Sequence, residues 1–332
     1  MIIPDGVEII DEYVFADTPA KRIVLPESVQ AIDRTAFNCG LELTRYEGAL
    51  YMGSEGNDYF ALFEAIDPEN TFEIKVHRET VVIAGDAFKK CKNLSAVCLP
   101  DGLKHIGYGA FEGTSLTDIV LPDGLETIYE GAFSGSELVT FTVPANVYEI
   151  KGGTFSGCSY LRQIFMHDNV TSIGCHAFEE CVRLSKIDLG ASVETVELGA
   201  FLGCKALRSV TAGDALNTVE RDAFKDCGSL SSVNLGSGLD YIGDSAFENC
   251  SSLTAIDLTS VTRINGKTFK NCSALEKIVL GNGLEFIGAG AFEGCKSLKL
   301  IEFRGDKKAW KALFKKFAKE AKLGKCKVKF IK

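Results

Sequence analysis

Residues 177–201 read AFEECVRLSKIDLGASVETVELGAF, a stretch that both begins and ends with Ala-Phe. The same pair, or a near variant, recurs along most of the chain. Its phenylalanines are Phe15, Phe37, Phe88, Phe111, Phe133, Phe155, Phe178, Phe201, Phe224, Phe247, Phe269 and Phe292. Ten of the eleven steps between them are 22 or 23 residues long, and the remaining step is 51. A period this regular over twelve copies predicts a stacked repeat array.

Within each unit the apolar positions predict a strand followed by a return arm. The motif L-x-x-I-x-L ends in alternating apolar, polar and apolar residues, which is typical of a short strand with one buried face. Pro or Gly follows in many units, as at Pro122 and Gly190, and is expected to end the strand. A second apolar pair, such as Leu125 with Ile128, precedes the Ala-Phe turn. Because one such coil cannot bury its own apolar residues, successive coils must stack with their strands in a parallel sheet.

These units resemble the BspA-like class of bacterial leucine-rich repeats, whose pattern joins L-x-x-I-x-L-P to V-x-x-I-G-x-x-A-F-x-x-C. The segments LPDGLKHIGYGAF (99–111) and LGSGLDYIGDSAF (235–247) match it nearly position for position. The resemblance implies an α/β fold, a leucine-rich-repeat solenoid that forms a curved right-handed coil. Its parallel sheet would line the concave face, with short strands or turns on the return arm. Family members are commonly bacterial cell-surface or secreted proteins, and some are implicated in adhesion to host matrix proteins or to other cells.

Two segments depart from the repeat and define the expected domain organisation. Residues 1–303 are predicted to form the solenoid, interrupted at about 48–71 by an irregular insert that we interpret as a hairpin patching an irregular coil. Residues 304–332 place apolar side chains at helical spacing among lysines and then a strand-like segment, which predicts a basic helix–strand cap. The same amphipathic pattern would also suit a membrane or nucleic-acid patch.

The composition excludes several classes of protein. With 46% hydrophobic residues the 332-residue chain is too apolar to be disordered, and no apolar run approaches the roughly 18 residues of a membrane-spanning helix. Residues 304–332 carry 12 Lys/Arg and 2 Asp/Glu, whereas residues 1–303 carry 24 and 43. Because this body is acidic, we expect no nucleic-acid partner.

The chain begins in the middle of a unit. The first apolar residues keep their offsets from Phe15, but nothing precedes Met1 to supply the preceding strand. Residues 1–15 also lack the basic region and apolar stretch of a signal peptide. Two explanations stay open: the natural protein extends upstream, which we favour, or residues 1–20 form a makeshift cap.

The twelve cysteines are interpreted as free thiols. Eight of them lie three residues after a repeat phenylalanine and should form one column: Cys91, Cys158, Cys181, Cys204, Cys227, Cys250, Cys272 and Cys295. Neighbours in such a column would have parallel side chains about 5 Å apart, which does not suit a disulfide. Thr114 and Ser136 occupy the same position in other units. A small side chain that hydrogen-bonds a turn carbonyl explains all ten residues.

Neither metal binding nor catalysis is predicted. The cluster Cys175, His176 and Cys181 fits no standard zinc spacing. The four histidines lie in different units, and no nucleophile elbow, P-loop or paired carboxylate stands out. We therefore expect no cofactor, no metal and no enzyme activity.

A binding surface is predicted from the strand residue that points to the concave side. In the second half of the array this residue is mostly polar, whereas Val120, Thr142 and Phe165 belong to a stretch that is mainly apolar. Arg162 and Lys186 occupy neighbouring strand positions, and an aromatic anchor with polar neighbours is typical of protein interfaces. These five residues are the predicted binding site. The alternative is that Phe165 is covered by neighbouring side chains or by the insert.

The predicted function is a non-catalytic surface or secreted adhesion module that binds a protein or glycan, with host matrix proteins among the candidate partners. Two alternatives are a structural spacer within a longer surface protein, or an intracellular scaffold if Met1 is the true start. The sequence indicates neither the ligand nor an oligomeric state.

Overall fold

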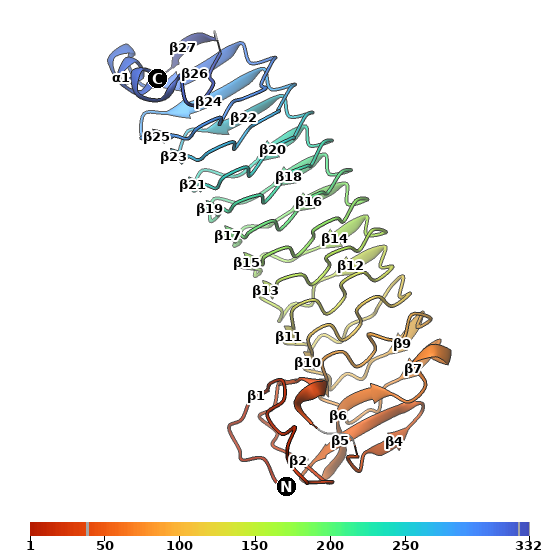
Figure 1. Cartoon of the computed structure of the whole chain (residues 1–332). Coiled ribbons are helices and arrows are strands. Elements are labelled where there is room, and N and C mark those ends of the chain that lie inside the picture. The colour runs from red at the N-terminus through yellow and green to blue at the C-terminus, as the bar shows by residue number, and fades with distance from the viewer. Residues whose placement is uncertain (38–39, 325, 332) are drawn as a thin grey trace. The chain divides into compact units, whose positions relative to one another are not determined.

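The computed structural model describes residues 1–37, 40–324 and 326–331. They form a leucine-rich-repeat solenoid of about 14 turns built from parallel strands (Figure 1), so the predicted fold class is confirmed. Helix is scarce in the described residues: the 3-10 turns η1 (Arg34–Ala36) and η2 (Pro68–Asn70), and helix α1 (Lys307–Phe317). The chain divides into two compact units. Unit 1 comprises Met1–Val147 with Gly153–Cys158, and unit 2 comprises Tyr148–Gly152 with Ser159–Lys332.

Unit 1 contains parallel coil strands and a three-stranded antiparallel segment. Its strands are β1 (Ile9–Ile10), β2 (Val24–Leu25), β3 (Ala31–Ile32), β4 (Thr44–Tyr46), β5 (Ala49–Ser54), β6 (Asn57–Ala65), β7 (Glu73–Lys75), β8 (Val82–Ile83), β9 (Ala96–Cys98), β10 (His105–Ile106), β11 (Thr127–Ile128) and β12 (Thr140–Thr142). The hairpin β5–β6 lies where the repeat is interrupted. Strand β5 pairs in parallel with β2, and β6 pairs in parallel with β8. The hairpin thus continues the sheet between regular coils.

One strand expected in unit 1 is absent. The motif at Leu116, Ile119 and Leu121 lies in non-strand backbone, and Ile119 is only half-buried.

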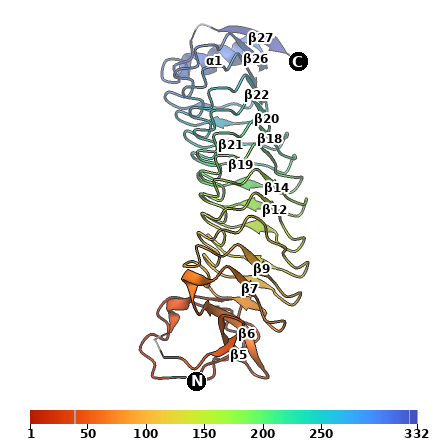
Figure 2. The ribbon, with the colours of Figure 1, turned by 90° about the vertical axis from the view of Figure 1, so that its right-hand side faces the viewer.

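Unit 2 has two kinds of strand on opposite sides (Figures 1 and 2). The two-residue strands are β13 (Glu149–Ile150), β15 (Ser172–Ile173), β17 (Thr195–Val196), β19 (Thr218–Val219), β21 (Tyr241–Ile242), β23 (Arg263–Ile264) and β25 (Phe286–Ile287), and they pair in this order as one parallel sheet. The longer strands are β14 (Gln163–Phe165), β16 (Lys186–Asp188), β18 (Ser209–Thr211), β20 (Ser232–Asn234), β22 (Ala255–Leu258), β24 (Lys277–Gly281), β26 (Leu300–Arg304) and β27 (Lys327–Ile331). We call the outward side of β14, β16, β18 and β20, with the residues leading into these strands, the strand face.

The phenylalanine column forms the core between these two sides. In unit 2 the rings from Phe178 to Phe292 stack with neighbouring centroids 5.1–5.7 Å apart and planes within 14° of parallel. A backbone ladder holds the turn in place, since Phe178 N–H donates to the Ala200 carbonyl (2.7 Å) and Phe201 N–H to the Ala223 carbonyl (2.8 Å). The 22- or 23-residue period therefore places each ring directly over the ring of the next coil.

The described residues of 304–331 form a helix and a strand at the end of unit 2. Asp306 accepts a hydrogen bond from Ala309 N–H (2.7 Å) at the start of α1, and Trp310, Leu313 and Phe317 are buried. Strand β27 pairs in parallel with β26, and Lys329 bonds Glu302 across this pair (3.0 Å). Hydrogen bonds from two lysines lower the pKa of Glu302, and the bond from Lys329 has a larger effect than the bond from Lys277.

Buried His105 makes the stability of unit 1 dependent on pH. His105 lies in β10 with 7% of its surface exposed, and its Nδ1 has no hydrogen-bond partner among the described residues. Burial lowers the pKa of this imidazole below its ordinary value of 6.5, so folding favours the neutral ring. Its contribution to stability is complete above pH 6.5 and is lost as pH falls from there toward the lower pKa of the folded state.

We therefore expect the free energy of unfolding of unit 1 to fall on acidification from pH 7 to pH 5. His105 contributes a slope of up to about 1.4 kcal/mol per pH unit, which denaturation midpoints measured across this range would show. His105→Leu should remove that part of the slope, whereas His167→Gln in unit 2 should keep it. An identical pH dependence in His105→Leu and the parent protein would contradict this assignment.

Candidate ligand-binding surface

The structure distributes the predicted site residues between the two units. Val120 and Thr142 belong to unit 1, whereas Arg162, Phe165 and Lys186 belong to unit 2. Val120 is 83% exposed, and Thr142, at the end of β12, is also exposed. The sequence pattern thus identified exposed positions in both units.

In unit 2, Phe165 is an apolar side chain on an otherwise polar surface. It ends β14 with 49% of its surface exposed, while Ile164 beside it points into the core. The equivalent residues of the next strands are Asp188, Thr211 and Asn234, all exposed. Burial of the middle residue explains this geometry, because side chains alternate across a strand.

Arg162 belongs to the same coil as Phe165, and Lys186 belongs to the next coil. Arg162 immediately precedes β14, Lys186 begins β16, and both side chains are exposed. The backbone holds the coils in register, since Ser185 N–H donates to the Arg162 carbonyl (3.4 Å). The strand face therefore presents Arg162, Phe165 and Lys186 together.

Two further cations on the strand face were missed by the sequence reasoning. Arg208 N–H donates to the Ser185 carbonyl (2.8 Å), which places Arg208 two coils along from Arg162 in the same column. The guanidinium carbon of Arg183 lies 4.7 Å from the centroid of the Tyr160 ring. Comparison of the columns two and four residues before the buried strand residue would have found both. We call Arg162, Arg183, Lys186 and Arg208 the basic patch.

The members of the basic patch differ in their ion pairing from nearby lysines of unit 2. Nearby lysines are paired: Lys205 with Glu180 (3.1 Å), and Lys225 with Asp222 (3.4 Å). Within residues 1–37, 40–324 and 326–331, no member of the basic patch forms an ion pair with a carboxylate. These four positive charges are therefore available to a ligand.

The cysteine column is built into the backbone of the solenoid. Cys204 Sγ donates to the Phe178 carbonyl (3.1 Å), and Cys227 Sγ donates to the Phe201 carbonyl (3.2 Å). In each case the acceptor belongs to the preceding coil. Thr114 Oγ1 instead bonds the carbonyl of Phe111 in its own coil (3.0 Å). The small polar side chain thus satisfies a turn carbonyl, as the repeat pattern predicted.

The described cysteines are all free thiols, and Cys39 lies outside the described residues. Burial raises the pKa of Cys158 to about 11, so column thiols stay protonated and unreactive at neutral pH. Cys98 and Cys175 are exposed. Partial burial and a hydrogen bond to Glu197 raise the pKa of Cys175.

Thiol titration of the native protein at neutral pH should therefore detect Cys98 and Cys175 but not the buried column. Reaction of Cys175 should accelerate as the pH rises, because only the thiolate reacts. Unfolding without reductant should raise the count close to all twelve cysteines. Recovery of only half of them after unfolding would show that the column contains disulfides.

No cluster of three or more His, Cys, Asp or Glu residues suited to a metal ion occurs in the described parts of the chain. Cys175 is held by Glu197, through its Sγ (3.1 Å) and its backbone N–H (2.9 Å). Cys181 is buried in the column. Of the cluster Cys175, His176 and Cys181, Cys175 therefore lies in a surface turn and Cys181 lies in the core.

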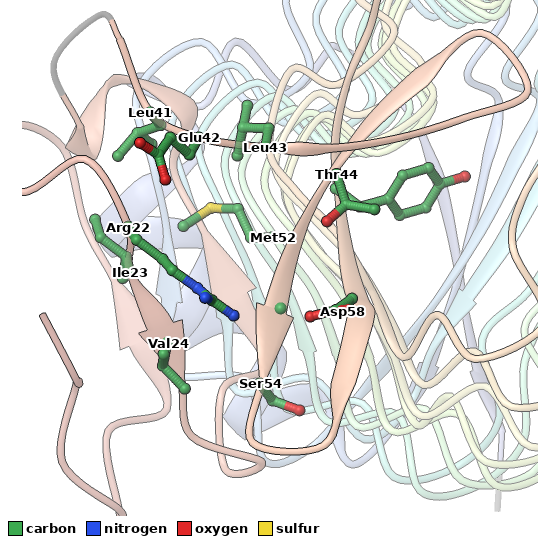
Figure 3. A pocket seen from close by; sticks show the side chains of 12 residues that line it. Arg22, Ile23, Val24, Leu41, Glu42, Leu43, Thr44, Met52, Ser54 and Asp58 are labelled. Carbon is green, nitrogen blue, oxygen red and sulfur yellow. The ribbon is translucent and has the colours of Figure 1, made fainter.

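Unit 1 contains a separate cleft of about 270 Å³ beside its hairpin (Figure 3). It opens where the edge of β5 changes partner, from β4 at Tyr51 to β2 at Gly53. Arg22, Glu42 and Asp58 line its sides, and the Arg22 side chain extends towards Asp58 (Figure 3). This lining offers both signs of charge and so favours no single class of ligand.

The repeat geometry agrees with a known family. The sequence pattern described as the BspA type leucine rich repeat region matches six copies, over residues 1–64, 81–208 and 197–316. The chain belongs to this family. BspA-type leucine-rich repeats are generally non-catalytic, and their fold suggests a protein-interaction module. No curated protein matches the chain.

Solved structures of bacterial leucine-rich-repeat proteins are similar to this BspA-type chain in fold. A protein from Bacteroides ovatus is 23% identical over 88% of this chain and 97% of its own, with a TM-score of 0.40. A leucine rich cell surface protein from Faecalibacterium prausnitzii is 24% identical over 94% of each chain, with a TM-score of 0.40. The pneumococcal vaccine antigen PcpA is 16% identical over 98% of this chain and 85% of its own, with a TM-score of 0.47. Among the described residues of this chain, no helix has both the length and the apolarity to cross a membrane.

Proposed function

We propose that this BspA-type chain is a non-catalytic recognition module that binds a protein or glycan ligand through its strand face. The observation that carries the proposal is Phe165, which leaves about half of its surface in solvent on a strand face that also presents Arg162 and Lys186. Exposed aromatic rings among polar groups often supply most of the binding energy of an interface. The membership of the family supports a place outside the cell, at a bacterial surface or in secreted form.

Unit 1 contributes a second exposed position to this proposal. Val120, at 83% exposure, is the apolar counterpart of Phe165 in that unit, and Thr142 is exposed on β12. We propose that Val120 and Thr142 contact a ligand on the surface of unit 1, independently of the residues of unit 2. Val120→Ser should then weaken binding less than Phe165→Ser, because a valine offers less contact area than an aromatic ring.

The proposal predicts a specific loss of binding in Phe165→Ser. We expect the purified chain to bind at least one component of a panel of extracellular-matrix proteins, mucins and glycans. The variant should bind it about tenfold or more weakly, equivalent to about 1.4 kcal/mol, at an unchanged melting temperature. Thr211→Ser, at the equivalent position of β18, is the matched control and should bind like the parent protein.

The alternative functions give different outcomes in this experiment. A spacer or an intracellular scaffold would bind no component of the panel. A ligand that binds Phe165→Ser and the parent protein equally would show that another surface of the chain performs recognition.

A further inference from the structure

The basic patch is a positively charged region on a body that is acidic as a whole. Residues 1–303 carry 24 basic and 43 acidic side chains, yet four exposed cations without carboxylate partners lie within three consecutive coils of unit 2. Cations gathered on an acidic protein keep a field of their own at short range, because charges separated by more than about 10 Å are largely screened at physiological salt. The strand face is therefore suited to a ligand of negative charge.

The spacing of the cations limits the form of that ligand. Ser185 N–H bonds the Arg162 carbonyl and Arg208 N–H bonds the Ser185 carbonyl, so Arg162 and Arg208 are separated by two strand spacings, roughly 10 Å. Lys186 lies in the coil between them. An extended peptide advances about 3.3 Å per residue, so carboxylates two residues apart lie about 7 Å apart on one face. Long arginine and lysine side chains reach across this spacing.

Two neighbouring side chains favour a peptide over a uniformly charged polymer. Asp188 lies on β16 next to the patch, with one carboxylate oxygen accepting a hydrogen bond from Gly190 N–H (3.2 Å). This carboxylate would repel a polyanion that places a charge at every step. Phe165, by contrast, offers an apolar surface that a sulfate or carboxylate cannot use. A ligand with a few acidic groups and one apolar side chain would bind the cations, avoid repulsion from Asp188 and contact Phe165.

We propose that the basic patch and Phe165 together bind an acidic peptide segment of a partner protein, in which Asp or Glu residues adjoin an apolar side chain. The inference rests on the proposed function and names the chemistry of its partner. Arg162 and Arg208 bind carboxylates through two parallel N–H···O bonds, for which the planar guanidinium is suited. The apolar side chain packs on Phe165, and the Arg183 guanidinium of the patch lies over the Tyr160 ring.

The test uses the full chain and synthetic peptides followed by fluorescence anisotropy. The probe is Gly-Glu-Glu-Phe-Glu-Glu-Gly, compared with a peptide in which Lys replaces Glu, with one in which Ser replaces Phe, and with a heparin fragment. We expect the first peptide to bind most tightly, with an affinity that falls as salt rises from about 50 to about 300 mM. The double variant Arg162→Gln/Arg208→Gln should weaken its binding by about tenfold or more.

Two controls separate the patch from a general effect of charge. Lys205→Gln removes a cation of the same coil as Arg208 that is already paired with Glu180, and it should leave peptide binding unchanged. Melting temperatures report whether each variant folds. Equal losses in Lys205→Gln and the double variant would overturn the inference, as would tighter binding of heparin that is independent of Phe165.

The outcome is distinguishable from failure of the proposed function. If a macromolecule of the panel binds in a manner that depends on Phe165 but not on Arg162 and Arg208, recognition by the strand face stands and the acidic partner is wrong. If Phe165→Ser affects neither the panel ligand nor the peptide, both proposals are wrong.

Discussion

Replacing Phe201 with alanine is expected to lower the free energy of unfolding by about 3–5 kcal/mol. The Phe201 ring is fully buried and stacks between Phe178, at 5.1 Å, and Phe224, at 5.2 Å. Its removal loses contacts on both faces and leaves a cavity that the neighbouring coils cannot fill, because their position is set by backbone hydrogen bonds. Chemical denaturation followed by circular dichroism would measure the change.

Leu198→Ala is the matched control, since Leu198 precedes the same turn but is 38% exposed. It should change stability by less than about 1 kcal/mol. Equal effects of the two variants would show that the phenylalanine column does not hold unit 2 together.

Gly281→Ala is expected to destabilise unit 2 by about 1–3 kcal/mol or more. Gly281 ends β24 and is paired with Arg304 of β26, and a Cβ at this position would overlap the backbone carbonyl of Thr259 in the preceding coil. Backbone atoms cannot move aside as a flexible side chain can, so the added methyl group must push the two coils apart. The expected result is a clear decrease in melting temperature.

Gly283→Ala provides the comparison two residues along. A Cβ at Gly283 would meet no atom within 4 Å, so alanine should be neutral or stabilise by about 0.4–1 kcal/mol through the unfolded chain. Equal stability of the Gly281→Ala and Gly283→Ala variants would contradict the close approach of the two coils at Gly281 and Thr259.

The repeat period was sufficient to predict the solenoid, because its spacing alone aligns buried residues such as Phe178, Phe201 and Phe224. It could not show how the interrupted region is built. The hairpin β5–β6 joins β2 to β8 through parallel pairs, but its own sequence does not follow the repeat pattern. Irregular pairing of this kind depends on tertiary contacts, which periodicity does not encode.

The candidate site was predicted in part for a similar reason. Alternation along a strand identified Phe165 and Lys186 as outward-facing, because that property is local. Arg208 and Arg183 join them through the stacking of separate coils, and the absence of carboxylate partners in the described residues depends on where every neighbouring acid lies. The acceptor of Cys204 Sγ also belongs to another coil. The repeat period shows which residues share a column, but their hydrogen-bond and ion-pair partners follow only from the three-dimensional structure.

In an oxidising medium, such as the exterior of a cell, the cysteine column would make the chain vulnerable to oxidation. While the coils are closed, Cys204, Cys227 and their neighbours are bonded to carbonyls and shielded from oxidants. A coil that opens releases its thiol, and in an oxidising medium a released thiol can cross-link to another before the coil closes again. The resulting disulfide does not fit the parallel geometry of the column, so refolding is blocked. The working lifetime of such a chain is then set by how rarely its coils open.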